Sequence, residues 1–414
     1  MKRRSREKTE HTNSNESQIV AAYHRQFSII HLFFGLMNGA TMFNAVYLKS
    51  SGLSATQVGL FISISSLVGM FAPMFWGMMS DRYKTVKKII YITLSLMLIT
   101  YFPIPIYSRV FIGATTLAPI LIVVQAAFAG TPEGMLTTWI MQTQRQHPDV
   151  QYGVIRMFFT GAFALSNFMY MLIIELTSID SIFIGYGIFA VAIMILLIRY
   201  KDIQPLNEDD TKIRQKIDVG SILKNKIIIS YMIFMMFAWV PSSSLGLFTP
   251  YLIEEIGSDS SVLGGMIAIR SLAAVPILFF SNRLIRRLKP FNTLLIGSSL
   301  FCISQLIFVF ARTITHITLN CVLMGVALGI LMPSEVSFIN EQAQEGLLAT
   351  TQTVCGTVYS LAGILCSYLG GIVVDTLGIR QYYFIVVCLT AAATIYFAIT
   401  TAIIKRHSLS SETA

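Results

Sequence analysis

A few ionisable side chains interrupt stretches of sequence that are otherwise apolar. Arg270 lies within such a stretch, Arg156 lies at the start of another, and Glu133 and Glu335 lie near the ends of two more. A charge inside a lipid bilayer costs at least about 2.5 kcal/mol, so each of these residues needs an opposite charge or a ligand. A guanidinium binds carboxylates and other lone-pair donors, and a carboxyl group carries a proton when burial raises its affinity for one. These residues therefore favour solute binding and proton transfer.

Other polar side chains share helical spacing with these charges. Thr160, Phe163 and Asn167 follow Arg156 at i+4, i+7 and i+11, which predicts one partly polar face on an apolar helix. Asn38 lies on the same side of its segment as His31 and Thr41. We predict that the solute is contacted by six residues: Asn38, Gln125, Arg156, Asn167, Trp239 and Arg270.

The two carboxylates are candidates for charge pairs and for proton coupling. Glu133 is the nearest candidate partner for Arg156, and Glu335 is one candidate partner for Arg270 and for the coupling proton. Alternatives stay open at this point. Arg156 is close enough to a helix end to extend its charge to the interface, and Arg270 and Glu335 also fit purely structural pairs between helices.

The composition indicates which elements position these residues. Of 414 residues 54% are hydrophobic and only 12% are charged, and the mean hydropathy is +0.67. Soluble domains carry about 25% charged residues, so lipid is the expected solvent. About 20 apolar residues span a bilayer as a helix, and twelve stretches qualify: Phe27–Leu48, Gln57–Ser80, Ile89–Ser108, Val110–Pro132, Met157–Ile174, Ser181–Ile198, Ile227–Ile253, Ser261–Phe280, Phe291–Ala311, Thr313–Ser334, Gly346–Val374 and Gln381–Ile404.

These stretches predict an all-α membrane protein with twelve transmembrane helices in two six-helix bundles. The expected parts are an N-terminal tail (1–26), a first bundle (27–198), a linker (199–226), a second bundle (227–404) and a C-terminal tail (405–414). Ser80-Asp81-Arg82 and Ser281-Asn282-Arg283 occupy equivalent positions in the two halves, as a duplicated six-helix unit requires.

The distribution of basic residues predicts the orientation. With the N-terminus in the cytoplasm, most of the 30 lysine and arginine residues fall in cytoplasmic segments. Only Lys49, Arg109, Arg312 and Arg380 then lie outside. We expect a multi-pass protein of the plasma (inner) membrane with both termini and the linker in the cytoplasm. The net charge of +9 needs no nucleic acid to explain it.

Several function classes find no support in the sequence. It contains no Walker loop, no catalytic triad and no metal-ligand spacing among its five cysteines and its histidines. We therefore expect no enzyme activity and no cofactor. The expected partners are a small solute and the lipid bilayer, and the protein is expected to act as a monomer.

The segment Gly77–Lys84, followed by Lys87 and Lys88, resembles the loop signature of the major facilitator superfamily. Three further segments resemble the group that includes the lactose, nucleoside and phenylpropionate permeases: Ala72–Gly77, Gly130–Pro132 and Tyr152–Phe158. The resemblance implies proton symport by alternating access, and it places Arg156 where the lactose permease has its sugar-binding arginine. It also implies a gating motif at Gly77, Asp81 and Arg82, to which Pro241 adds a bend in the seventh span.

We therefore expect a secondary active transporter of the major facilitator fold. The expected activity is proton-coupled uptake of a sugar, a nucleoside or an aromatic acid near the middle of the membrane. Two arginines suit a polar neutral solute or an organic anion equally well. A small-molecule exporter (antiporter) of the same fold and a non-transporting membrane sensor remain alternatives.

Overall fold

The computed structural model describes residues 2–107, 111–112, 115–200, 222, 224–343 and 348–412. Its chain forms two compact units. The first comprises Met1–Thr41, Phe71–Tyr170 and Ser178–Thr211, and the second comprises Met42–Met70, Met171–Thr177 and Lys212–Ala414. Two segments from the first half of the sequence thus belong to the second unit. The predicted linker, 199–226, falls mostly outside the described residues.

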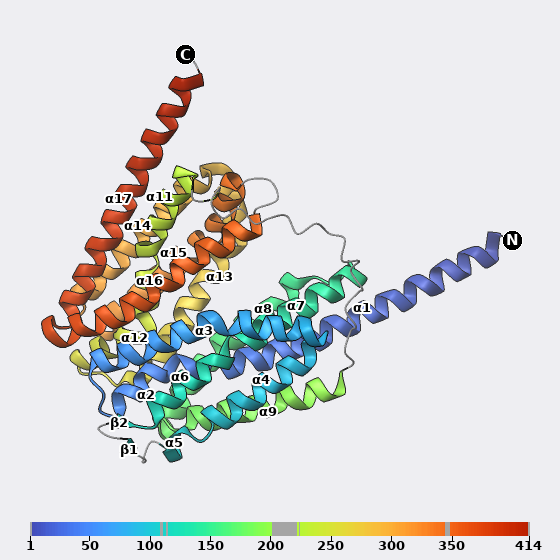
Figure 1. The fold of residues 1–414 in the computed structure, drawn as a ribbon, viewed down its shortest axis with the longest axis horizontal. Helices are drawn as coiled ribbons and strands as arrows, with labels where there is room; N and C mark the ends of the chain where they lie inside the picture. The colour runs from blue at the N-terminus through green and yellow to red at the C-terminus, as the bar shows by residue number, and fades with distance from the viewer. Residues whose placement is uncertain are drawn as a thin grey trace. The chain divides into compact units, whose positions relative to one another are not determined.

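Helices dominate the first half of the chain (Figure 1). The first unit contains α1 (Lys2–Gly39), α4 (Val86–Tyr101), α5 (Ile104–Tyr107), α6 (Ala118–Ala129), α7 (Thr131–Gln146) and α9 (Ser181–Arg199), with most of α8 (Tyr152–Leu176). A short 3₁₀ turn, η1 (Ala40–Phe43), leads into α2 (Asn44–Ser50), and α3 spans Ala55–Tyr83. A two-residue hairpin joins β1 (Phe111–Ile112) to β2 (Thr115–Thr116) in antiparallel register.

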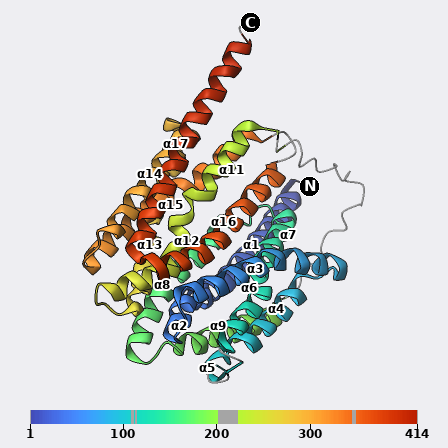
Figure 2. The ribbon, with the colours of Figure 1, turned by 60° about the vertical axis from the view of Figure 1, so that its left-hand side comes forward.

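The rest of the second unit is helical as well. It contains α11 (Lys226–Ala238), α12 (Val240–Glu255), η2 (Ser260–Val262), α13 (Leu263–Leu288), α14 (Pro290–Val309), α15 (Ile314–Gln342), α16 (Leu348–Leu377) and α17 (Ile379–Glu412). Helices α14, α15 and α17 lie side by side, with α13 packed against α15 (Figure 2).

The prediction of twelve spans in an all-α protein is confirmed, because twelve helices among the described residues are long and apolar enough to cross a membrane. The predicted fourth span is wrong at both ends. It was expected at Val110–Pro132, whereas the membrane-length helical segment covers Ala118–Gln144. The preceding apolar residues include the β1–β2 hairpin, and Pro132 lies in the first turn of α7, where proline is tolerated.

Glycines allow the closest helix contacts within each unit. On α15, a Cβ at Gly325 or Gly329 would meet α13 at the carbonyl oxygens of Arg270 and Ala274. On α1, a Cβ at Gly35 would lie 2.5 Å from the carbonyl oxygen of Phe159 in α8. Small residues spaced four apart let helix backbones approach in a membrane, where lipid removes the hydrophobic drive for association.

The α1–α8 contact yields a stability prediction. We expect Gly35→Ala to lower the stability of the protein by about 1–3 kcal/mol, because the new methyl group would overlap backbone atoms that cannot rotate away. Gly161→Ala on α8 is the matched control, since no atom lies within 4 Å of a Cβ there. Thermal unfolding in detergent measures both changes. Equal melting temperatures for the two variants would refute the close-packing assignment.

Candidate functional site

The first polar cluster, which we call the Arg156 cluster, lies in the first unit. Arg156, in the first turns of α8, forms an ion pair with Glu133 in the first turn of α7. Its guanidinium also lies 4.4 Å from the ring centre of Phe159. The pairing of Arg156 with Glu133 proposed from the sequence is therefore present. Because the two side chains remain 34% and 37% exposed, the pair is accessible to a solute.

The predicted solute-binding amides of α1 and α8 direct their N–H groups to their own helices. Asn38 donates to Phe34 O at 2.9 Å, and Asn167 donates to Phe163 O at 2.7 Å. Asn38 is half-buried, whereas Asn167 is 0% exposed and its Oδ1 has no partner. The predicted face from Arg156 to Asn167 is thus not uniformly accessible, because Gly39 of α1 packs against the backbone N of Asn167. A solute contact by Asn167 stays a prediction.

The structure buries Gln125 rather than placing it on an open surface. This α6 residue is 4% exposed and lies beside Tyr186 of α9. A helix junction at Gly130 separates it from Glu133, so the two residues do not share one continuous helix face.

The second polar cluster, the Glu335 cluster, surrounds a cavity of about 360 Å³ in the second unit. The Glu335 carboxylate accepts hydrogen bonds from Trp239 Nε1 at 2.9 Å and from the Tyr231 hydroxyl at 3.5 Å. The Trp239 ring packs edge-on against Tyr359, with ring centres 5.3 Å apart. Gln352 also lines this cavity. An ionisable group thus faces a mostly apolar space.

A break in the seventh span positions Trp239. Helix α11 ends at Ala238 and α12 begins at Val240, so Trp239 caps both, and Pro241 lies in the first turn of α12. The bend predicted at Pro241 is therefore a helix interruption one to two residues earlier. The hydroxyls of Ser243 and Ser244 donate to the Trp239 and Val240 carbonyls, which satisfies backbone groups near the break.

The predicted pairing of Arg270 with Glu335 is wrong. Gly325 of α15 packs on the Arg270 carbonyl, and Glu335 lies ten residues further along the same helix. At 1.5 Å per residue that is about 15 Å, beyond the reach of an arginine side chain. Among the described residues no ion pair and no hydrogen bond involves the Arg270 guanidinium, and its Nε is sealed from solvent without a partner.

The predicted gating motif at the end of α3 is only partly described. The side chain of Asp81 lies outside the described residues, and Arg82 is exposed in the last turn. Gly77 of the predicted motif does not mark a close helix approach. The nearest atom to a Cβ there, Met135 Cε, is 3.9 Å away, which is ordinary van der Waals contact.

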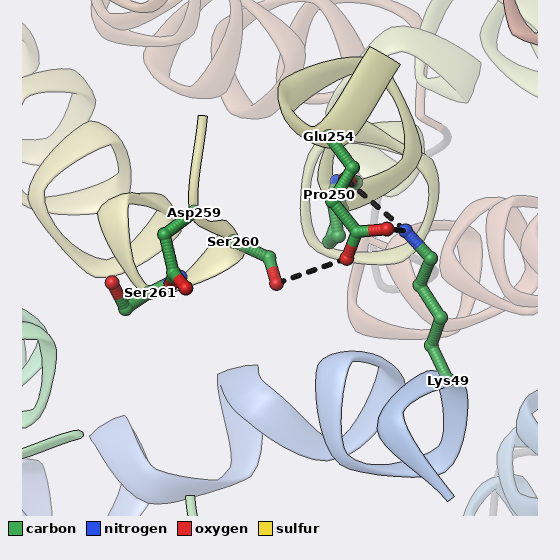
Figure 3. Close-up of polar contacts among 6 residues, drawn as sticks. All are labelled: Lys49, Pro250, Glu254, Asp259, Ser260 and Ser261. Carbon is green, nitrogen blue, oxygen red and sulfur yellow. Dashed lines mark hydrogen bonds and ion pairs between the residues drawn. The ribbon is translucent and has the colours of Figure 1, made fainter. Parts of the chain in front are cut away.

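A group of polar contacts that the sequence did not predict, which we call the α2–α12 bridge, joins two helices of the second unit. Lys49, near the end of α2, forms an ion pair with Glu254 of α12 (Figure 3). Its ammonium group also donates to Pro250 O at 3.4 Å and lies 4.2 Å from the ring centre of Tyr251. The bridge therefore joins the predicted outer end of the first span to the predicted outer end of the seventh.

The loop after α12 holds the acceptor of this bridge in place. Ser260 donates to the Glu254 carboxylate at 3.2 Å, and Asp259 caps η2 by accepting from Ser261 N at 2.7 Å (Figure 3). Hydrogen bonds from the side chain and backbone of Ser261 lower the pKa of Asp259, so this cap stays ionised at neutral pH. Gly257, with φ of +80°, provides the turn.

A second missed contact, the α3–α16 cap, satisfies the start of α3. The Asp375 carboxylate on α16 accepts from the backbone N–H groups of Ala55 at 3.0 Å and Thr56 at 2.6 Å. Ser54 and Gln57 cap the same helix end reciprocally. A carboxylate at a helix N-terminus is favoured by the unpaired N–H groups and the helix dipole. This carboxylate comes from the other half of the sequence.

One part of these contacts was predictable from the sequence. The Ser54–Gln57 spacing is a capping box and predicts the start of a helix at Ala55. Lys49 stood out as one of four basic residues on the predicted outer side. Nothing in the sequence paired Lys49 with Glu254 or Ala55 with Asp375, because each pair is separated by more than 200 residues.

Comparison with known proteins agrees with this architecture. The sequence matches the family described as "MFS_1 like family" over residues 24–385. It is 23% identical over 339 residues to the uncharacterized transporter YwbF of Bacillus subtilis (strain 168), covering 81% of this chain and 82% of that one. It is 23% identical over 393 residues to the raffinose permease of Escherichia coli, covering 89% and 90%.

Solved structures share the fold. A crystal structure of the nucleoside transporter NupG matches with a TM-score of 0.77 and 16% identity, covering 91% of this chain and 98% of that one. A D-xylose-proton symporter matches with a TM-score of 0.69 and 13% identity, covering 91% and 97%. At these identities the likeness shows a common fold.

The α2–α12 bridge yields a prediction about its own opening. Ser63 of α3 is 5% exposed and donates to Ile364 O of α16 at 2.6 Å, so a cysteine placed there should react slowly with a maleimide. An exposed ion pair contributes about 0.2–1 kcal/mol. We therefore expect Lys49→Gln to raise the labelling rate of Ser63→Cys by roughly two- to fivefold.

The control uses an ion pair that lies wholly within the second half of the sequence. Arg380→Gln removes the Arg380–Glu255 pair between α17 and α12 and should leave the labelling rate unchanged. Labelling of the chain that keeps Ser63 gives the background from the native free cysteines. Equal acceleration by Lys49→Gln and Arg380→Gln would contradict a specific role for the bridge.

Proposed function

Because the chain belongs to the MFS_1 like family, we propose that this transporter of the major facilitator fold takes up a small organic solute together with protons. Its relatives are transporters rather than enzymes. Uptake, proton coupling and the identity of the solute are the parts that we propose. We argue for them from the chemistry of the two polar clusters.

The observation that carries proton coupling is the setting of Glu335. Its carboxylate faces a cavity of about 360 Å³, and the hydrogen bonds that it receives come from two uncharged donors, Trp239 and Tyr231. No described cation forms an ion pair with it. A carboxylate without a counter-ion in an apolar medium favours its protonated form. Glu335 is therefore suited to take up a proton and to release it when the surroundings become wetter.

Each polar cluster, taken by itself, offers groups that suit a solute. Arg156 keeps its ion pair with Glu133 and retains surface for a solute. Trp239 contributes an aromatic wall in the second unit, while its indole N–H donates to Glu335. Binding energy that differs between two conformations of the protein is what shifts their populations. The α2–α12 bridge and the α3–α16 cap are the contacts that we expect to break and re-form in each cycle.

The proposal also includes the location, orientation and oligomeric state of the protein. We infer that the protein is a monomer in the plasma membrane with both termini in the cytoplasm, and that it needs no cofactor besides the coupling proton. The twelve apolar helices and the distribution of basic residues support this placement. The name of one structural relative, a proton symporter for D-xylose, supports proton coupling by analogy.

Reconstitution tests the activity. Purified protein in proteoliposomes is offered a panel of radiolabelled sugars, nucleosides and aromatic acids, with the interior made alkaline relative to the exterior. Accumulation that collapses when a protonophore is added supports proton-coupled uptake. Accumulation that requires the reverse gradient supports the exporter alternative, and absence of any flux with intact binding supports a sensor.

The role of Glu335 gives a sharper prediction. We expect Glu335→Gln to reduce gradient-driven accumulation by at least tenfold while solute exchange between equal concentrations continues, because the amide keeps an acceptor for Trp239 but holds no transferable proton. Glu341→Gln on the same helix is the matched control, since Glu341 is exposed. If gradient-driven accumulation by Glu335→Gln equals that of the control, Glu335 is not the coupling site.

A further inference from the structure

We propose that the solute is an organic anion, and that Arg270 binds its acid group while the apolar walls of the Glu335 cluster contact its body. This inference rests on the proposed transport function and chooses between the neutral and anionic solutes that the sequence left open. It depends on how the two membrane arginines differ. Arg156 has a counter-ion in the protein, and Arg270 has none among the described residues.

The guanidinium of Arg270 is placed where a missing partner is costly. The residue is half-buried, and its Nε is sealed from solvent with no hydrogen-bond acceptor. An uncompensated cation in a membrane span costs at least about 2.5 kcal/mol. A protein that keeps such a charge without a structural partner is expected to use it for binding, because a bound anion then recovers that cost.

The carboxylates of the two clusters cannot supply the missing charge. Glu133 is already paired with Arg156. Glu335 lies about 15 Å further along α15 than the point at which α15 meets the Arg270 backbone. The close approach of α15 to the Arg270 backbone, where a Cβ on Gly325 would overlap the Arg270 carbonyl oxygen, places the two helices at this depth. The guanidinium has no protein anion among the described residues.

The cavity that Tyr359 lines indicates what the rest of the solute is like. Arg270 interacts electrostatically with Tyr359, and Tyr359 lines the cavity of about 360 Å³. The remaining walls are largely apolar and aromatic, with Met235, Trp239 and Met332 among them. A sugar would leave many hydroxyl groups without partners against such walls, and each unmet hydrogen bond weakens binding. An acid with an aromatic or aliphatic body satisfies both the cation and the walls.

The test compares carboxylates with their neutral analogues on the full-length protein in detergent. Hexanoate, benzoate and indole-3-acetate are each paired with the corresponding primary amide, and binding is measured by thermal shift and by calorimetry. We expect at least one carboxylate to stabilise the protein and its amide to bind at least tenfold more weakly. Arg270→Gln should abolish that preference, and Arg270→Lys should retain part of it.

Two readouts separate binding from a structural role. Arg286→Gln removes the same charge from an exposed position on the same helix and should bind carboxylates like the parent protein. Without any ligand, Arg270→Gln should melt at the same temperature as the parent protein or above it, because it removes an unpaired buried charge. A lower melting temperature together with unchanged carboxylate binding would assign Arg270 to structure and overturn the proposal.

The remaining outcomes also decide the question. If none of the carboxylates binds, or if the amides bind as well as the acids, the anion assignment is wrong. Proton-driven flux of a neutral solute in proteoliposomes would then leave the proposed transport function standing. Carboxylate binding without flux of any solute would instead contradict transport and leave the binding assignment intact.

Discussion

The absence of water from the hydrocarbon interior is the constraint that shapes this protein. Each polar atom inside a span must find its hydrogen-bond partner within the protein, because lipid offers none. In a helix, the backbone N–H and C=O groups satisfy one another. Asn38 and Asn167 meet this need for their amide N–H groups by donating to carbonyls of their own helices, and Arg156 meets it with Glu133. Arg270 is the described membrane charge for which this solution is missing.

Two kinds of contact hold the helices together, and they differ in how readily they break. Glycine contacts such as Gly35 against α8 and Gly325 against α13 fit backbone to backbone and allow little adjustment. The Lys49–Glu254 bridge and the Asp375 cap are polar, partly exposed contacts whose groups can exchange protein partners for water. A transporter needs both kinds, since its bundles must stay intact while the contacts at one end open.

Much of the fold was predictable from the sequence, because membrane spans are set by local hydropathy. The Arg156–Glu133 pair was also predictable, since the two residues lie in the first turns of consecutive helices. The fourth span was misplaced because apolar residues before Ala118 form a hairpin rather than a helix. Hydropathy cannot distinguish these two conformations over so short a stretch.

The wrong and missed predictions of residue pairs have a different cause from the misplaced fourth span. Arg270 and Glu335 were proposed as partners because they were the two prominent charges of the second half, but their depths along the helices differ by about 15 Å. Lys49 with Glu254, and Asp375 with the start of α3, pair segments from opposite halves of the sequence. Such contacts depend on helix packing, which a single sequence does not encode in any local pattern. The solute contacts predicted for Asn38, Gln125, Asn167 and Trp239 remain predictions.

An experimental structure with a transported solute bound would test the central claim most directly. That claim is that the unpaired guanidinium of Arg270 is reserved for the solute. The account predicts an acid group of the solute within hydrogen-bond distance of Arg270, while Arg156 keeps its pairing with Glu133. A bound solute that leaves Arg270 untouched, with the guanidinium paired to a carboxylate of the protein, would contradict it.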